Sequence, residues 1–313
     1  MECTRCGKDS TISTRGEKFC DDCFVDFLNR KIRPQLTHFR VNGSPDSKTV
    51  SPLIVVPINF RAASLALVDM LVNMRKLQMQ KHKQMDGFRI LCLYIGDLSD
   101  DVSWPWPEVD FEQIELNVSS IEQPIGIDSD TLTRSSKQDL EKIMTRQMIL
   151  AYAKKHEAFT AFAYSMTKLS EITLAETVKG RGANLPALVT PDLMLDKVVY
   201  PLRDITSSEL EKYCKITGLN KYIIPDAPVP SVTKRQSIDE IVHLYFTKVQ
   251  EEFPSVVSTV SKISSRLSQT GEECGLCQPR YIGKSVKLCY ACASIAKETE
   301  MKRKLDILDM YEL

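Results

Sequence analysis

The sequence predicts an α/β protein, in which a parallel sheet is covered by helices and a four-cysteine metal module lies at each end. Short apolar runs alternate with longer helix-like segments between positions 51 and 230. Two C-x2-C pairs lie near the N-terminus and two more near the C-terminus. The composition, 43% hydrophobic and 26% charged over 313 residues, is that of a globular chain with room for one large domain and small appendages.

The core elements follow from local patterns. Short apolar runs with β-branched residues indicate buried strands, and apolar positions at helical spacing indicate covering helices. Because strands and helices alternate, the sheet is expected to be parallel and covered on both faces. The predicted strands are 52–58, 88–95, 111–118 and 159–164, followed by the apolar run 197–202. The predicted core helices are 62–79, 137–156, 167–178, 207–217 and 237–253.

Two helix starts carry capping patterns. Ser136 followed by Asp139 resembles a capping box at the start of the long helix, and Ser237 with Glu240 forms one at the start of the last core helix. The last helix also carries an apolar stripe, which is interpreted as core packing. Its members are Ile238, Ile241, Val242, Tyr245, Phe246 and Val249.

The domain organisation is expected to comprise five segments. These are an N-terminal zinc module at 1–25, a linker at 26–50, the α/β domain at 51–230, a helical segment at 231–268, and a C-terminal zinc module with a tail at 269–313.

The charge balance and the hydropathy of the chain limit the classes of partner that it could bind. Lysine plus arginine number 41, as do aspartate plus glutamate, so a nucleic-acid surface would have to be a local patch. No apolar run reaches the roughly 18 residues of a membrane span, and the N-terminus has no apolar signal-peptide core. A cytosolic or nuclear protein with reduced thiols and no membrane contact is expected.

The cysteine spacing is the strongest chemical pattern. A C-x2-C turn presents two thiolates to one metal ion, and a second pair completes a tetrahedron. Disulfides are disfavoured in a reducing compartment, whereas an iron–sulfur cluster on four thiolates stays an alternative to Zn²⁺. With four sulfurs bound, no coordination position is left for a substrate, so two structural Zn²⁺ sites are expected. The ligands are Cys3, Cys6, Cys20 and Cys23 at one end and Cys274, Cys277, Cys289 and Cys292 at the other.

Two cysteines and one turn bear on catalysis. Cys92 and Cys214 lie in apolar patterns and are interpreted as core residues. The turn after the first strand, 57–64, contains no glycine, although a phosphate cradle needs bare backbone N–H groups. Phe60 and Arg61 are bulky there, and Ser64 alone could cap a phosphate. A nucleotide site at this turn is therefore disfavoured.

A second loop, VKGRGANLP at 178–186, places Lys179 and Arg181 beside glycines. Two interpretations stay open. The loop is either the end of a helix followed by a turn, or a contact for phosphate or an RNA backbone.

Several of these motifs together resemble a known family. The segments MECTRC…KFCDDCF, SMTKLSE, VKGRG and VVYPLRD, bracketed by the two cysteine quartets, resemble the cytoplasmic tRNA 2-thiolation protein family, in particular its second, non-catalytic subunit. The resemblance spans Cys3 to Cys292. It implies a PP-loop core similar to the adenine nucleotide alpha-hydrolase-like ATPases.

The resemblance also implies that the catalytic apparatus is lost. Active members carry a Ser-Gly-Gly-x-Asp-Ser loop after the first strand. The corresponding positions here are Asn59, Phe60, Arg61 and Ala63, and only Ser64 matches. The acidic pair of a second motif is missing at 163–169, and the expected catalytic cysteines are missing at 135–136 and 225–236.

The function implied by the resemblance is that of a pseudoenzyme subunit. It would form a heterodimer with the active thiolation subunit, which places sulfur on the wobble uridine of tRNAs for lysine, glutamate and glutamine. The sulfur would come from a thiocarboxylate on a ubiquitin-related modifier protein, and Lys179 and Arg181 are candidate tRNA contacts. Two alternatives stay open: an active ATP-dependent tRNA sulfurtransferase, and a zinc-dependent RNA-binding scaffold unrelated to thiolation.

Overall fold

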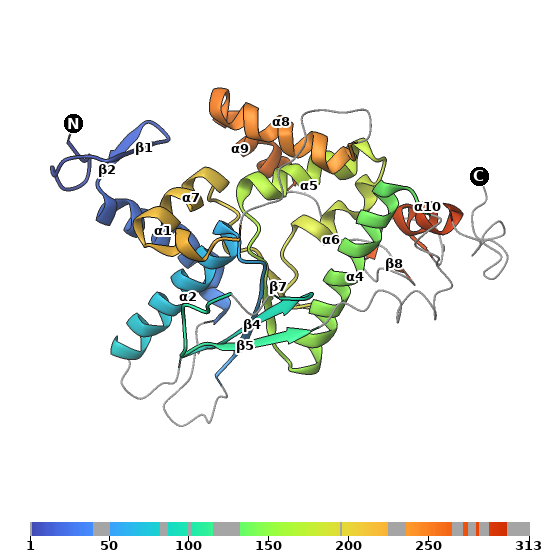
Figure 1. The fold of residues 1–313 in the computed structure, drawn as a ribbon, viewed down its shortest axis with the longest axis horizontal. Helices are drawn as coiled ribbons and strands as arrows, with labels where there is room; N and C mark the ends of the chain where they lie inside the picture. Colours follow the sequence, from blue (N-terminus) through green and yellow to red (C-terminus); the bar gives the residue numbers. More distant parts are fainter. Residues whose placement is uncertain are drawn as a thin grey trace. The chain divides into compact units, whose positions relative to one another are not determined.

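In the computed structural model, drawn as a ribbon in Figure 1, the chain forms two compact units. The sheet unit comprises Met1–Ile114, Ala153–Lys168 and Leu193–Asp226, and the helical unit comprises Glu115–Tyr152, Leu169–Asp192 and Ala227–Leu313. The structure describes residues 2–39, 51–81, 87–98, 102–114, 132–194, 196–224, 236–264, 272–274, 280–281 and 288–298. The predicted segment boundaries stay a prediction.

The sheet unit contains a five-stranded sheet in the order β5-β4-β3-β6-β7, and every strand pair is parallel. The central strand β3 is apolar on both faces, and Ile54, Val55 and Val56 are fully buried. Such a strand needs cover on both sides, which explains the continuous apolar run in its sequence. The predicted α/β fold with a parallel sheet is confirmed. The strands are β3 (Leu53–Ile58), β4 (Arg89–Ile95), β5 (Asp110–Ile114), β6 (Phe159–Ala161) and β7 (Val198–Val199).

Helices in the same unit complete its core. They are α1 (Asp21–Ile32), η1 (Arg33–Phe39), α2 (Ala62–Lys81), α7 (Ser207–Ile216) and η4 (Leu219–Tyr222). Helices α2 and α7 are joined by a hydrogen bond, 2.6 Å long, from the Tyr213 hydroxyl to Oδ2 of Asp69. Helix α7 begins with a capping box between Thr206 and Glu209, which the sequence analysis missed.

Over its described residues, the helical unit consists of helices and the antiparallel strand pair β8–β9. Helices α8 and α9 lie side by side in it (Figure 1). Its elements are α4 (Arg134–Lys155, which continues into the sheet unit), α5 (Met166–Val178), η3 (Gly182–Asn184), α6 (Leu185–Val189), α8 (Ile238–Glu252), α9 (Pro254–Ser264), β8 (Glu272–Glu273), β9 (Arg280–Tyr281) and α10 (Tyr290–Glu298). Among the described residues, no helix is both long and apolar enough to cross a membrane.

One predicted helix start is wrong and one is confirmed. Helix α4 begins three residues before the expected position, because Thr133 caps it: the Thr133 carbonyl accepts from the N–H of Lys137 and its hydroxyl accepts from the N–H of Ser136. Asp139 caps nothing and instead forms ion pairs, described below. At α8 the predicted capping box of Ser237 and Glu240 is present with both hydrogen bonds.

The apolar stripe of α8 is only partly core. Val242 and Phe246 are buried, as expected. Ile241 and Tyr245 are 46% and 48% exposed, so the prediction of core packing is wrong for them. Helical spacing identifies the apolar face of a helix, but it does not say how much of that face a neighbouring element covers.

Candidate metal centres and the turn after the first core strand

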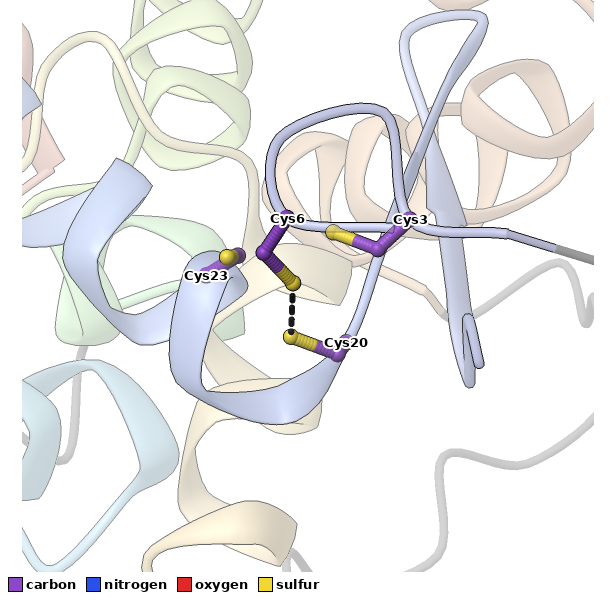
Figure 2. Close-up of side chains that lie close together, drawn as sticks. All are labelled: Cys3, Cys6, Cys20 and Cys23. Carbon is purple, nitrogen blue, oxygen red and sulfur yellow. Dashed lines mark hydrogen bonds between the residues drawn. The ribbon is translucent and has the colours of Figure 1, made fainter. Parts of the chain in front are cut away.

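The N-terminal cysteines converge on one point (Figure 2). Strands β1 (Ile12–Thr14) and β2 (Glu17–Phe19) form an antiparallel hairpin that leads to Cys20, and Cys23 follows in the first turn of α1. Cys3 and Cys6 lie on a tight turn closed by a 3.0 Å hydrogen bond from the N–H of Gly7 to the carbonyl of Cys3. All four sulfurs lie within 4.8 Å of one another.

The sulfur geometry fits a single metal ion. The Sγ atoms of Cys6 and Cys20 are 3.5 Å apart, and a tetrahedron with Zn–S bonds of about 2.3 Å places its sulfurs about 3.8 Å apart. An iron–sulfur cluster would hold the thiolates farther apart, because its own iron and sulfide atoms lie between them. The described cysteines form no disulfide.

The pKa values of the thiols in this cluster are shifted in opposite directions. Burial raises the pKa of Cys3, but hydrogen bonds from backbone N–H groups, led by that of Cys20, outweigh it and lower the pKa to about 6. Hydrogen bonds with the sulfurs of Cys20 and Cys6 raise the pKa of Cys23 to about 12. One thiolate is therefore ready to bind a cation, while a proton must leave Cys23 when a metal enters.

The C-terminal cluster repeats part of this arrangement. Cys274, Cys289 and Cys292 have sulfurs within 4.8 Å of one another, and all three residues are buried. Cys289 directly precedes α10 and Cys292 lies in its first turn, as Cys20 and Cys23 do in α1. The backbone N–H of Cys289 donates to Sγ of Cys274 at 3.2 Å. The fourth predicted ligand, Cys277, lies outside the described residues.

The turn after β3 is filled by its own side chains. The Ser64 hydroxyl accepts hydrogen bonds from the N–H groups of Asn59 (3.4 Å) and Arg61 (3.3 Å), and it donates to Oδ1 of Asn59 at 2.8 Å. Oδ1 of Asn59 also accepts from the N–H of Arg61 at 3.2 Å. Two backbone N–H groups that a phosphate cradle would use are therefore already satisfied by side chains of the turn itself.

Phe60 occupies the middle of the same turn. Its φ of 54° lies in the left-handed region that favours glycine. Its ring is 1% exposed and packs against Tyr94, Trp104 and Phe111. The apolar packing of the Phe60 ring compensates the backbone strain.

The remaining cysteines are poor nucleophiles. Cys92 and Cys214 are fully buried, as expected from their apolar surroundings. Burial raises the pKa of both thiols, that of Cys214 to about 12. Neither thiol is ionised near neutral pH, and the thiolate is the reactive form.

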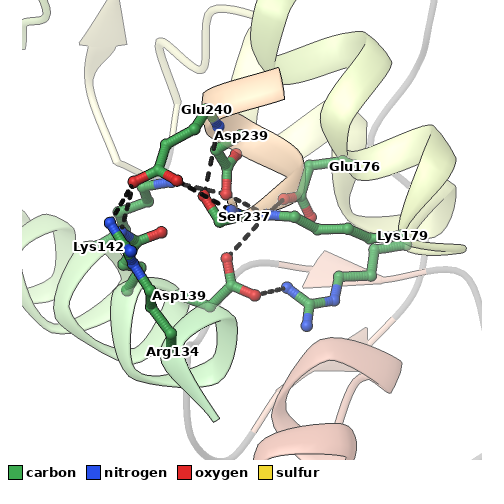
Figure 3. Close-up of polar contacts among 10 residues, drawn as sticks. Arg134, Asp139, Lys142, Glu176, Lys179, Ser237, Asp239 and Glu240 are labelled. Carbon is green, nitrogen blue, oxygen red and sulfur yellow. Dashed lines mark hydrogen bonds and ion pairs between the residues drawn. The ribbon is translucent and has the colours of Figure 1, made fainter. Parts of the chain in front are cut away.

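The loop that follows α5 takes part in a buried ion cluster (Figure 3). Nζ of Lys179 lies 2.8 Å from Oδ1 of Asp139 on α4 and 2.6 Å from Oδ2 of Asp239 on α8. The guanidinium of Arg181 pairs with the other oxygen of Asp139. The side chains of Lys179 and Arg181 are only 5% and 9% exposed. Their predicted contact with tRNA stays a prediction, and the sequence analysis missed both carboxylate partners.

A second missed contact joins the N-terminal cysteine module to α7 within the sheet unit. The guanidinium of Arg15, at the tip of the β1–β2 hairpin, makes two 2.8 Å hydrogen bonds to the carboxylate of Glu209 on α7. The Thr14 hydroxyl donates to the same carboxylate at 3.1 Å. Burial raises the pKa of Glu209, but the bonds from Arg15 outweigh this and lower it below its usual range.

We expect Arg15→Ala to loosen this attachment, because it leaves a buried carboxylate without its cation. The free energy of unfolding of the sheet unit should fall by about 1–3 kcal/mol, measured by urea titration at pH 7. Because the folded pKa of Glu209 is depressed, its contribution is present above about pH 4.3 and is lost as the pH falls through the lower folded value. The exposed pair Arg30–Asp26 provides a control, and Arg30→Ala should cost less than about 1 kcal/mol. Equal losses in both variants would contradict the prediction.

Comparison with known proteins identifies relatives along most of the chain. A family model described as cytoplasmic tRNA 2-thiolation protein 2 matches residues 237–308. The protein of that name from Yarrowia lipolytica is 27% identical, and the match covers 93% of this chain and 78% of the relative. The one from Aspergillus oryzae is 25% identical, with 93% and 95% covered.

The fold also has a solved counterpart. The U34-tRNA thiolase NcsA from Methanococcus maripaludis, solved with its [4Fe-4S] cluster, superposes with a TM-score of 0.62 at 15% identity, covering 95% of this chain and 96% of that one. This likeness supports the predicted α/β fold with a parallel sheet. The predicted resemblance is confirmed as well: over about nine tenths of its length, the chain is similar to proteins named cytoplasmic tRNA 2-thiolation protein 2.

Proposed function

We propose that this chain is the non-catalytic subunit of a cytoplasmic complex that 2-thiolates the wobble uridine of tRNAs for lysine, glutamate and glutamine. It pairs as a heterodimer with an active thiolation subunit, which receives sulfur from the thiocarboxylate of a ubiquitin-related modifier. The proposed process, tRNA 2-thiolation, is taken from the names of the similar proteins. The turn from Asn59 to Ser64 supports the non-catalytic role.

This turn argues against ATP binding on energetic grounds. A phosphate entering it would have to displace the Ser64 hydroxyl from two backbone N–H groups and move the buried ring of Phe60. Large-to-small changes at buried phenylalanines cost about 3–5 kcal/mol, which indicates the scale of losing this packing. The phosphate would gain few hydrogen bonds in return, because the turn contains no glycine to leave its backbone N–H groups accessible.

We infer further that each cysteine cluster holds a structural Zn²⁺ ion. Four thiolates suit zinc and leave no open position on the metal, so the ion would support folding rather than activate water. In the N-terminal module it would join the Cys3–Cys6 turn to the start of α1, which are otherwise linked by a short hairpin. The C-terminal ion would do the same for α10, with Cys277 as the fourth ligand.

The candidate tRNA contacts need one refinement. Lys179 and Arg181 are held by Asp139 and Asp239, so an RNA phosphate would have to compete with carboxylates already in place. If these cations meet tRNA, the cluster must open first. Their direct role in the folded chain is to balance buried negative charge.

Nucleotide binding is the direct test of the non-catalytic role. ATP binding to the purified chain should be undetectable by equilibrium dialysis under conditions in which the active subunit binds it. The active subunit should then thiolate tRNA faster, or bind it more tightly, when this chain is added. A chain carrying Cys92→Ala and Cys214→Ala should stimulate equally well, because neither thiol takes part.

Each alternative function predicts a different result. ATP binding, or thiolation by the chain alone, would identify it as an active sulfurtransferase. Normal 2-thiouridine levels in cells that lack the protein would favour an RNA-binding scaffold unrelated to thiolation.

A further inference from the structure

The loop between α5 and α6 reaches the C-terminal cysteine cluster. Gly180, with φ of 73°, reverses the chain after α5, and the N–H of Arg181 returns to the carbonyl of Glu176 at 2.7 Å. The short helix η3 follows and ends at Asn184, whose N–H donates to the carbonyl of Arg181 at 3.0 Å. The backbone around Asn184 is thereby fixed, and the residue is only 6% exposed.

The side chain of Asn184 contacts one of the cluster sulfurs. Its amide nitrogen Nδ2 lies 3.3 Å from Sγ of Cys289, which is 2% exposed. Both residues belong to the helical unit, and the contact joins positions 105 apart in the sequence. The amide NH2 group can only donate to this sulfur, because its nitrogen carries two protons and no lone pair that could accept a hydrogen bond.

Such a donor has a specific use beside a metal. Four thiolates on one divalent cation carry an excess of negative charge, and burying that charge is costly without hydrogen bonds to the sulfurs. A neutral amide supplies a proton donor without adding a second cation. In the same cluster the sulfur of Cys274 has a donor too, the backbone N–H of Cys289.

We propose that Asn184 is a positioning residue of the C-terminal metal centre, donating a hydrogen bond from its side-chain amide to the metal-bound sulfur of Cys289. This inference rests on the proposed occupation of that cluster by a metal ion. It also gives the loop that carries Lys179 and Arg181 a second anchor, at its far end, in addition to the ion cluster at its start.

The test compares Asn184→Leu and Asn184→Asp with the wild-type chain, each loaded with Zn²⁺. Leucine keeps approximately the volume and removes the donor, while aspartate keeps the shape and places a carboxylate against the thiolate. The chain is mixed with excess chelator, and N-ethylmaleimide labelling of each cysteine is followed by peptide mass spectrometry. The N-terminal cysteines serve as an internal control, because they belong to the other compact unit.

We expect Cys274, Cys289 and Cys292 to be labelled about 10-fold to 100-fold faster in both variants, with the N-terminal cysteines unchanged, as for loss of a hydrogen bond to a metal ligand. In the Co²⁺-loaded protein, loss of the donor should also shift the thiolate-to-metal charge-transfer band to lower energy. Asn184→Ala gives the same comparison if the leucine variant does not fold.

Three results would overturn the inference. Wild-type labelling rates in Asn184→Leu would show that the amide only fills space. Faster labelling in both clusters would show general unfolding rather than a local role. Equal, unprotected labelling of the C-terminal cysteines in the wild-type chain would show that no metal is bound there, which would refute the proposed metal separately from the role of Asn184.

Discussion

The variant Cys20→Ser is expected to lose the N-terminal metal ion and to unfold the module that the ion supports. Cys20 stands between the β1–β2 hairpin and α1, so its sulfur joins the two parts of the site. A structural zinc contributes on the order of 10 kcal/mol of binding free energy to small metal-dependent folds, more than so short a hairpin can replace. Bound zinc, measured by inductively coupled plasma mass spectrometry, should fall from two ions per chain to one.

Limited proteolysis with trypsin would detect this local unfolding. Arg5 and Arg15 lie in this module, and cleavage after both should become fast in the variant. Cys92→Ala is the matched control, because Cys92 is buried in β4 and belongs to neither cluster. If Cys20→Ser retains two zinc ions and resists trypsin like the wild-type chain, the structural role of this site is refuted.

The same site should bind metal more weakly as the pH falls. Metal binding requires deprotonated sulfurs, and the metal-free pKa of Cys23 is raised to about 12. Protons therefore compete with the cation, and acid favours the metal-free form.

The second large effect is expected for Asp139→Asn. Asp139 is buried and faces both Lys179 and Arg181, so neutralising it leaves two buried cations short of a counter-charge. Breaking a buried ion pair by removing one partner costs about 3–5 kcal/mol. The loss should appear in urea unfolding of the helical unit, followed by hydrogen exchange in α4 and α5.

A matched control lies at the edge of the same cluster. Lys142 pairs with Asp239 at 2.9 Å, but its side chain is 56% exposed. Lys142→Met should cost less than about 1 kcal/mol, because water already solvates most of its charge. If Asp139→Asn is as mild as Lys142→Met, the cluster does not stabilise the fold as proposed.

The pH dependence of the ion cluster has two limits. Burial opposes the charge on Asp239, but Lys142 and Lys179 outweigh it and lower its pKa, so its contribution is present above about pH 3.9 and is lost as the pH falls through the folded value. Burial also opposes the charge on Lys179, but Asp139 and Asp239 raise its pKa. That contribution is present below about pH 10.4 and is lost as the pH rises through the raised value. Glu176, 3.6 Å from Lys179, titrates between these limits because burial raises its pKa, so its contribution is lost as the pH rises through that raised value. Above that value and below the lysine limit, the stability from this cluster should be constant.

The sequence by itself determined the parallel sheet and the cysteine pattern, because both depend on local periodicity. A strand buried on both faces must be apolar throughout, so β3 and β4 could be located within about one residue. Two C-x2-C pairs specify a four-sulfur site from spacing alone. The missing glycines after β3 likewise argued against a phosphate cradle before any geometry was known.

Tertiary structure decided what the charged and polar side chains do. Lys179 is paired with carboxylates 40 and 60 positions away, and Asn184 contacts a sulfur 105 positions away. Ser136 was expected to cap α4 with Asp139 as its partner, but Thr133 caps the helix, and the carboxylate of Asp139 neutralises buried cations instead. Such pairings depend on which distant segments the packed helices bring together, and local sequence periodicity carries no record of that.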